Sequence, residues 1–294
     1  MLFALRRNSP KVGQPLALPE MKPVKLPASY YQQFDADYTR DVPAEGYAGW
    51  KTADIELSPE HTAVVVMHAW ECGTIDQWPG WRRSVEYHPR ALKILAEVFP
   101  PLLTAVRASP LKLFHVVGGR DYYTHLAGYK NTLKLAGASP AWPRVPKDPA
   151  FEAQEQFRRD NVFVGKRNWP DVDEGFKKLD FAPEARPVDD EPIAEDGHQL
   201  AALCHAHGIN HLVYMGFAIN WCLLMSPGGM VDLGRYGVMC STIREAVTAV
   251  ENAETARTER EKAQALWRVA LNFGFVFGAD DFTRMVRSLP RSSG

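Results

Sequence analysis

Residues 211–222, HLVYMGFAINWC, join an apolar run to a glycine and then to a cysteine. The run 211–216 is typical of a strand that is buried on both faces of a parallel sheet. A strand that turns straight into a helix at Gly216 presents backbone N–H groups at the helix start, which suit an oxyanion and lower the pKa of a cysteine in the first turn. Cys222 is therefore a candidate nucleophile, and its alternative role is that of a small buried apolar residue.

Further apolar runs lie on both sides of this stretch. We expect strands at 62–67 (TAVVVM), 112–117 (KLFHVV), 161–164 (NVFV) and 238–243 (VMCSTI), and an edge strand at 275–278 (FVFG). Helical periodicity covers 88–107 with a proline break, 197–208, most of 245–273, and 279–288. Strands that alternate with helices predict βαβ units. The expected fold is a Rossmann-like, three-layer α/β/α sandwich around a mainly parallel sheet of about six strands.

Residues 1–60 differ in composition from the rest of the chain. They contain Pro10, Pro15, Pro19, Pro23 and Pro27, together with the aromatic stretches SYYQQFDADYTR and GYAGW. Prolines at this density oppose a regular helix or a central strand. We expect an irregular arm that packs on its own domain or on a second subunit. Residues 61–294 are expected to form one domain, with a loop or lid inserted near 121–160, where proline is again frequent.

Composition excludes several classes of partner. The 34 basic and 35 acidic residues nearly cancel, so no basic face predicts a nucleic-acid partner. No apolar run approaches the roughly 20 residues that a membrane helix needs. A short apolar start followed by Arg6 and Arg7 is the reverse of a signal peptide, so we expect a cytoplasmic protein. The four cysteines lack CxxC or metal-ligand spacing, which argues against a disulfide framework.

Two segments in fixed order carry a resemblance to a known family. DNVFVGK (160–166), followed after a long gap by HGINHLVYMGFAINWC (207–222), resembles the isochorismatase-like cysteine hydrolases, which include nicotinamidases, N-carbamoylsarcosine amidases and isochorismatases. GRDYYTH (119–125) and the stretch 236–246 are further, shorter matches. The resemblance spans roughly residues 60–290, and it depends on the order and spacing of the matches.

The resemblance implies roles for individual residues. Cys222 is the nucleophile, and Lys166 lies beside it and stabilises the thiolate; read alone, Lys166 is also explained as a side chain that reaches solvent at the end of a strand. The N–H groups of Ala218 and Cys222 form the oxyanion hole, and the Phe217–Ala218 peptide is cis.

One expected catalytic residue is replaced. The family has an aspartate at the end of the first strand, where this chain has His68. A histidine can also take a thiol proton, although a neighbouring Lys166 lowers its pKa. Glu71 and Asp76 lie nearby and are alternative acids. The other interpretation of His68 is a buried core histidine in a protein that has lost activity.

Trp70, Glu71, Asn220 and Trp221 are expected at the pocket, where tryptophans frame a planar substrate or simply pack in the core. Some family members bind a metal through an aspartate and histidines after the second strand. Here the candidates are Asp121 and His125, and two ligands do not make a site. We expect neither a metal nor an organic cofactor.

The expected function is that of a cysteine hydrolase acting on a small amide or related C–N bond. Two alternatives stay open: an isochorismatase-type vinyl-ether hydrolysis without a covalent cysteine, and a catalytically silent protein that binds a small molecule. A hydrogen bond between Glu71 and Cys222 would favour catalysis, and a plugged pocket would favour the silent role. The family resemblance and the aromatic arm also imply a homo-oligomer, a dimer or a tetramer.

Overall fold

The central strand of the molecule is the apolar run TAVVVM. In the computed structural model, which describes residues 21–140 and 143–291, it forms β3 (Thr62–Met67), and every residue of it is buried. Val64 and Val66 contact the apolar core on one face of the sheet, while Val65 and Met67 contact the core on the other face. Two-sided burial explains why this strand is continuously apolar.

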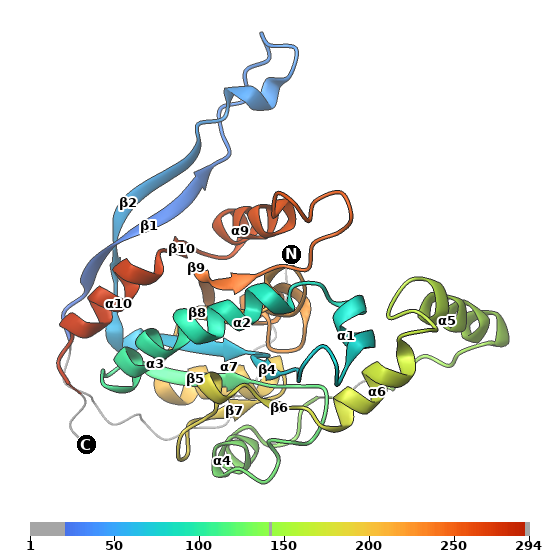
Figure 1. Cartoon of the computed structure of the whole chain (residues 1–294). Helices are drawn as coiled ribbons and strands as arrows, with labels where there is room; N and C mark the ends of the chain where they lie inside the picture. The colour runs from blue at the N-terminus through green and yellow to red at the C-terminus, as the bar shows by residue number, and fades with distance from the viewer. Residues whose placement is uncertain (1–20, 141–142, 292–294) are drawn as a thin grey trace, which may run out of the picture.

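Eight strands form the main sheet of the described residues, in the order β2-β1-β10-β9-β8-β3-β5-β7 (Figure 1). Besides β3 they are β1 (Val24–Gln32), β2 (Gly49–Leu57), β5 (Lys112–Val116), β7 (Ile193–Ala194), β8 (His211–Phe217), β9 (Met239–Thr248) and β10 (Val276–Phe277). The six strands from β10 to β7 are parallel, which confirms the expected core of the fold. The sheet exceeds six strands because β1 and β2 add an antiparallel hairpin.

Helices cover both faces of the sheet and complete a three-layer α/β/α sandwich. One face carries α2 (His88–Glu97), α3 (Phe99–Arg107) and α10 (Ala279–Ser288); the other carries α7 (Gly197–His207), α8 (Met230–Arg235) and α9 (Arg260–Asn272). The helix expected at 88–107 breaks at Val98, just before two prolines. The helix expected over 245–273 is shorter, because β9 continues to Thr248 and helix begins only at Arg260.

The arm predicted as irregular contains a regular β-hairpin, so that prediction is wrong for residues 21–60, while residues 1–20 lie outside the described residues. β1 and β2 pair over nine residues each and project from the body (Figure 1). One edge of β1 pairs with β2 along its whole length, whereas the other edge pairs with β10 only at Ser29. Pro27, which has no backbone N–H, fits in β1 because that second edge is almost unpaired. Short 3₁₀ turns occur at Pro43–Gly46 and Pro59–His61.

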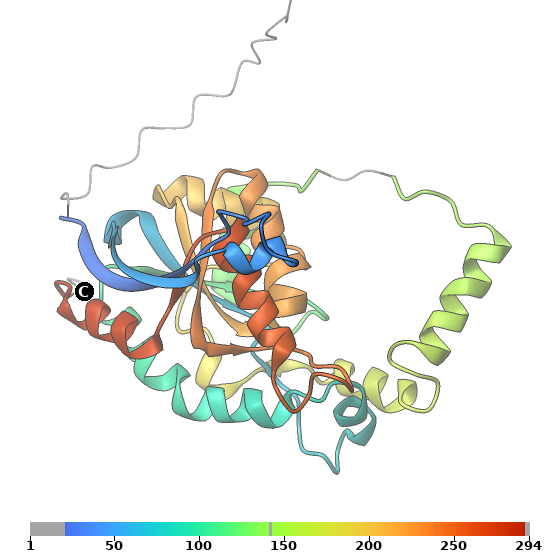
Figure 2. The ribbon, with the colours of Figure 1, turned by 90° about the horizontal axis from the view of Figure 1, so that it is seen from above.

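The segment expected as a loop or lid near 121–160 contains two helices, α4 (Ala127–Ala136) and α5 (Pro149–Asn161). An extended stretch joins them, and α5 stands apart from the sandwich (Figure 2). Residues 141 and 142 of that stretch lie outside the described residues. Around the carboxyl edge of the sheet lie α1 (Pro79–Ser84), α6 (Trp169–Lys177), a 3₁₀ turn (Pro183–Ala185) and a two-stranded sheet of β4 (Trp70–Glu71) and β6 (Asp180–Phe181).

The strand predicted at 161–164 does not form. α5 runs through Asn161, and residues 162–168 make an irregular turn in which Val162 and Phe163 are exposed. The edge of the parallel sheet is taken instead by β7, whose two residues pair with the end of β5. No helix in the described part of the chain is long and apolar enough to cross a membrane.

Candidate functional site

The ends of β3 and β8 bring the predicted catalytic segments to one edge of the sheet. Met67 and Gly216 are paired in the parallel register, so His68 and Phe217 are the next residues on adjacent strands. Gly216 has a φ of +128°, and a Cβ on it would lie 1.9 Å from the carbonyl oxygen of Met67. Only glycine permits this approach, which fixes the path of the chain toward Cys222.

Cys222 lies in a short π-helix, η4 (Ile219–Leu223), directly after β8. The preceding Phe217–Ala218 peptide is cis. The Ala218 carbonyl accepts hydrogen bonds from the N–H groups of Trp221 and Leu223, both at 3.2 Å, and these bonds hold the turn. π-Turns of this kind occur frequently at functional sites.

Cys222 is half-buried in this turn. Burial raises the pKa of this thiol above its ordinary value, and hydrogen bonds from the Ser226 hydroxyl and the Ala218 N–H oppose the shift without cancelling it. The thiol is therefore neutral at pH 7. Ser226 is a site residue that the sequence reasoning missed, because its Ser-Pro-Gly-Gly context indicated only a helix interruption.

His68 is buried and has a left-handed backbone, with φ of +50°. Its N–H donates to the carbonyl of Val116 at 3.1 Å, and its ring stacks on Trp70 with centroids 4.6 Å apart. Burial lowers the pKa of His68 to about 4, against the opposing effect of a hydrogen bond to the backbone of Val117. The imidazole is therefore neutral at physiological pH.

Lys166 does not lie at the end of a strand, in contrast to the prediction. It is exposed on the turn after α5, where its backbone N–H donates to the carbonyl of Asp160 at 3.0 Å. Within residues 21–140 and 143–291, its ammonium group makes no hydrogen bond or ion pair with Cys222 or His68. The predicted strand-end position depended on the strand at 161–164, which does not form.

The strand that precedes α7 is β7, and Glu195 directly follows it. Glu195 accepts hydrogen bonds from the Tyr123 hydroxyl at 2.9 Å and from the side-chain amide of Gln199 at 3.1 Å.

Two predicted pocket residues have structural contacts of their own. Both ends of the Asn220 side-chain amide bond the backbone of Val250, at 2.8 and 2.9 Å, and tie the η4 turn to the segment after β9. Glu71 is exposed and accepts from the N–H of Gly73 at 2.8 Å, so it does not bond Cys222. Its predicted role as a substitute acid has no contact to support it.

The predicted tryptophans divide between the interior and the surface. The Trp70 indole stacks on His68 and donates to the Tyr122 hydroxyl at 2.8 Å. Trp221 is 37% exposed and packs edge-on against Phe163, with centroids 5.2 Å apart. The loop 162–168 therefore reaches the candidate site through Phe163 rather than through the lysine.

The two metal candidates, Asp121 and His125, are exposed in the turn before α4. Among the described residues, no three histidine, cysteine, aspartate or glutamate side chains are grouped so that they could hold a metal ion.

A small cavity adjoins His68 and Phe217. Its volume is about 10 Å³, which is room for about one water molecule. It is lined by His68, Trp70, Cys72, Tyr87, His88, Ala91, Leu92, Leu95 and Phe217. Burial raises the pKa of Cys72 to about 12 and lowers that of His88 to about 4, so both groups are neutral. Sequence reasoning missed Cys72, Tyr87 and His88, because no pattern predicts which residues of a covering helix will reach the end of a strand.

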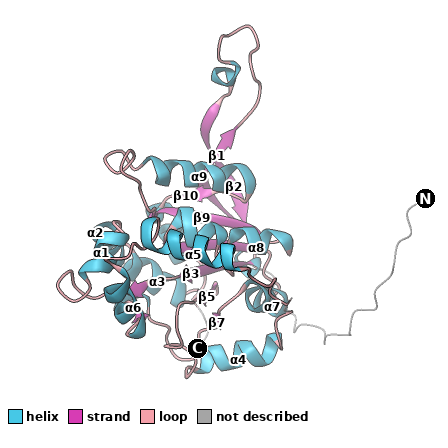
Figure 3. Ribbon diagram, turned by 90° about the vertical axis from the view of Figure 1, so that its right-hand side faces the viewer, coloured by secondary structure: helices cyan, strands magenta, loops and turns pink. Residues whose placement is uncertain are grey.

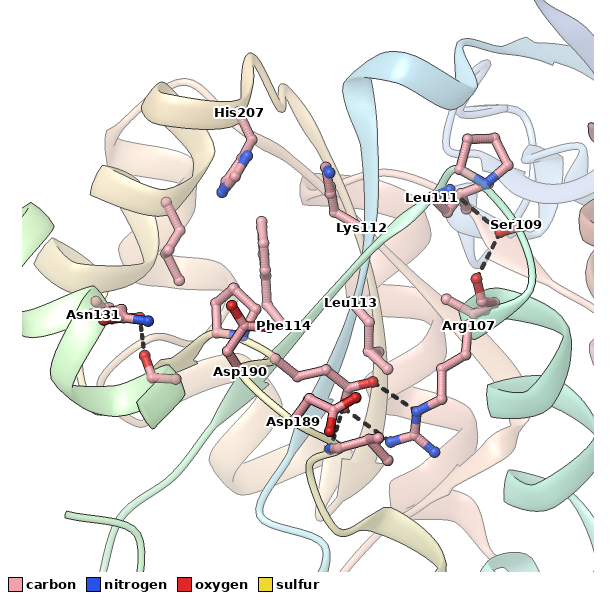
Figure 4. A pocket seen from close by; sticks show the side chains of 18 of the residues that line it. Arg107, Ser109, Leu111, Lys112, Leu113, Phe114, Asn131, Asp189, Asp190 and His207 are labelled. Carbon is pink, nitrogen blue, oxygen red and sulfur yellow. Dashed lines mark hydrogen bonds and ion pairs between the residues drawn. The ribbon is translucent and has the colours of Figure 1, made fainter. Parts of the chain in front are cut away.

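A larger cavity, of about 640 Å³, lies at the opposite edge of the sheet, where β5 and β7 begin (Figure 4). Arg107 and Glu191 form a double hydrogen bond there, at 2.7 and 2.9 Å, and the buried ring of His115 contacts the same carboxylate at 2.8 Å. Lys112 and His207 also line the cavity (Figure 4). This cavity is separate from Cys222.

The fold and this site define an α/β sandwich with a cysteine at the carboxyl edge of its parallel sheet. Solved structures to which the chain is similar include a cysteine hydrolase from Pseudomonas syringae pv. phaseolicola 1448A, at 15% identity and a TM-score of 0.45 over 79% of this chain and 95% of that one. The chain is also similar to an isochorismatase-like hydrolase from Alkaliphilus metalliredigens, at 15% identity and a TM-score of 0.42 over 76% of this chain and 97% of that one. A third similar structure is an N-carbamoylsarcosine amidase from Thermoplasma acidophilum, at 15% identity and a TM-score of 0.37 over 75% of this chain and 97% of that one.

The structural neighbours are thus isochorismatase-family and cysteine hydrolase proteins, the group that the sequence resembles. No protein-family model matches the chain, and no curated protein matches it. At these identities and TM-scores the likeness concerns the fold alone, so the chemistry has to be argued from the residues of this chain.

Proposed function

We propose that this chain hydrolyses a small amide or related C–N bond with Cys222 as the nucleophile. The observation that supports the proposal is the place of Cys222 in the π-turn that directly follows β8, at the carboxyl edge of the parallel sheet and one strand away from the end of β3, which His68 follows. The sulfur attacks the carbonyl carbon, and the N–H groups of Ala218 and Cys222 stabilise the negative oxygen. The amine leaves with a proton, and water then hydrolyses the thioester.

The charge states of the site set the rate that this chemistry can reach. Burial raises the pKa of the Cys222 thiol and lowers the pKa of the His68 imidazole to about 4. Moving the proton from sulfur to His68 therefore costs free energy. We expect slow turnover at neutral pH and a rate that rises with pH as thiolate forms.

A second candidate is a catalytically silent protein that binds a small molecule. One observation favours it over catalysis: Glu71, the alternative acid, bonds the N–H of Gly73 and not Cys222. The vinyl-ether alternative has less support, because it needs a group that protonates the substrate at neutral pH, and His68 is neutral there.

Alkylation and turnover together test the proposal. We would label the full-length chain with iodoacetamide at pH 6–10, map the labelled peptides by mass, and assay small uncharged amides for ammonia or amine release. The expected result is labelling of Cys222 that rises across this range without an earlier plateau, and amide hydrolysis that Cys222→Ser abolishes. Cys204→Ser is the matched control, because Cys204 is a buried residue of α7 and not of the turn after β8.

Hydrolysis that survives in Cys222→Ser would contradict the nucleophile. If no amide is turned over while a small molecule binds and protects Cys222 from labelling, the silent binding protein becomes the better description.

A further inference from the structure

Two buried histidines with unpartnered ring nitrogens line the same cavity. Among the described residues, four buried side-chain polar atoms lack a hydrogen-bond partner, and two of them are Nδ1 of His68 and Nε2 of His88. His68 follows β3 and His88 is the first residue of α2, so they come from different layers of the sandwich. Both line the cavity of about 10 Å³, and both are nine-tenths or more buried.

The two ring nitrogens of His68 have different surroundings. Nε2 lies beside Gly118, where a Cβ would be 3.3 Å from it, whereas Nδ1 is buried without a hydrogen-bond partner. A water molecule that donates to Nδ1 would leave the proton of the neutral ring on Nε2, and Nδ1 would then carry the lone pair.

Most of the remaining cavity wall is apolar. Ala91, Leu92, Leu95 and Phe217 supply only carbon, the thiol of Cys72 is neutral, and the Trp70 indole already donates to Tyr122. The hydroxyl of Tyr87 is the other polar group of the wall. A buried polar atom without a partner is destabilising, and proteins commonly satisfy such atoms with an internal water. The volume fits one water, which can donate to one nitrogen and donate to or accept from the other.

We propose that this cavity holds one ordered water molecule that bridges Nδ1 of His68 and Nε2 of His88, which makes His88 a positioning residue for His68. The catalytic part of this inference rests on the proposed function, whereas the water site itself does not. Tyr87 lies between the cavity and the nucleophile. It lines the cavity, and its pKa is raised first by burial and then by the nearby thiols of Cys72 and Cys222.

The charged groups that face the pair lie around His88. Burial is the main cause of its lowered pKa; Arg82 lowers it further, and Glu86 opposes the shift. His68 faces the Trp70 ring and the backbone of Val117. The bridging water thus links the two rings in a neutral pocket and holds Nδ1 of His68 as a hydrogen-bond acceptor.

The water site can be tested without any substrate. A high-resolution crystal structure of the full chain should show one density peak within hydrogen-bond distance of both nitrogens. Long-range ¹⁵N–¹H spectra should show His68 as the Nε2–H tautomer. In His88→Phe, which keeps an aromatic ring of similar size, the peak should vanish and the His68 signal should become a tautomer mixture. His88→Gln, which keeps a polar group, should restore the single tautomer.

An empty cavity, a metal ion identified by anomalous scattering, or an unchanged His68 tautomer in folded His88→Phe would overturn the inference. Amide hydrolysis supplies the second readout: His88→Phe should lower kcat on the order of 10-fold to 100-fold and leave KM unchanged, with rescue by His88→Gln. If no amide is turned over by the native chain, the proposed function fails while the density and tautomer results still decide the water site.

Discussion

At the scale of single residues, burial controls the charge of the groups around Cys222. The thiols of Cys72 and Cys222 and the rings of His68 and His88 are all neutral at pH 7, because desolvation is the leading cause of each pKa shift. Lys166, the one cation expected beside them, is exposed on the turn after α5. A neutral, partly buried site suits an uncharged amide better than a carboxylate or an ammonium, because nothing in it offsets the loss of solvent around a charge.

The buried histidines make the fold sensitive to acid. Their pKa is about 4 in the folded chain against 6.5 in a solvated one, so the unfolded chain binds more protons below pH 6.5. We expect full stability above pH 6.5 and a loss of about 1.4 kcal/mol per pH unit for each of His68 and His88 down to pH 4. Urea unfolding at pH 4.5–7.5 measures this slope.

Replacing one of the two histidines should make that slope shallower. His88→Phe removes one histidine's share of it, and His125→Phe controls for the same change at an exposed position. Equal slopes in the native chain and in His88→Phe would show that His88 does not carry the predicted share.

At the scale of elements, the sequence predicts those strands whose burial requires a long run of apolar residues. Strands β3, β5 and β8 were predictable because each has at least five residues, nearly all of them buried. β7 has only Ile193 and Ala194, too few for any periodicity. NVFV looked like a strand, yet the helical sequence before it extends through Asn161 and only Val164 is buried. The error over Lys166 followed from that strand.

Cys222 and its donors were predictable in part, for a different reason. The turn after β8 is local, so glycine and cysteine spacing indicate it, and the cis peptide falls where the family resemblance placed it. His88 and Tyr87 belong to another layer, and only the packing of α2 against the sheet brings them near His68. No local pattern encodes that contact.

The short strand β7 depends on a charged anchor at its start. Glu191 pairs with Arg107 and contacts the buried ring of His115. Burial alone would raise the pKa of Glu191, but these two partners outweigh burial and lower the pKa to about 2. Glu191→Ala should lower the free energy of unfolding by about 3 kcal/mol, the lower end for a buried pair because Arg107 is partly exposed. Glu174→Ala, which removes an exposed partner of Lys177, should cost less than about 1 kcal/mol. Chemical denaturation of both variants compares them, and equal losses would contradict the anchoring role.

At the scale of the whole molecule, two elements extend beyond the sandwich: the loop end of the β1–β2 hairpin (Figure 3) and α5 (Figure 2). Tyr31 and Gln33 of the hairpin contact Trp267 of α9, with a hydrogen bond from the indole to Gln33 at 3.1 Å. The loop that joins the two strands carries exposed Phe34, Tyr38 and Val42. No residue of α5 is buried. A lone helix of 13 residues is marginal in water, and exposed apolar side chains gathered on one projection mark a contact surface.

These two elements lead to a prediction about assembly. We expect the chain to form a homo-oligomer in which the hairpin tip packs on a second copy, because that contact would bury the apolar side chains that its own body leaves exposed. Light scattering and sedimentation velocity over a concentration series should give a mass that is a multiple of the 33.0 kDa chain. The double variant Phe34→Ser, Tyr38→Ser should shift the mass toward the monomer, whereas Val145→Ser, on an exposed loop, should not. A native chain that stays monomeric at every concentration would refute the contact, and the hairpin tip would then need a partner of another kind.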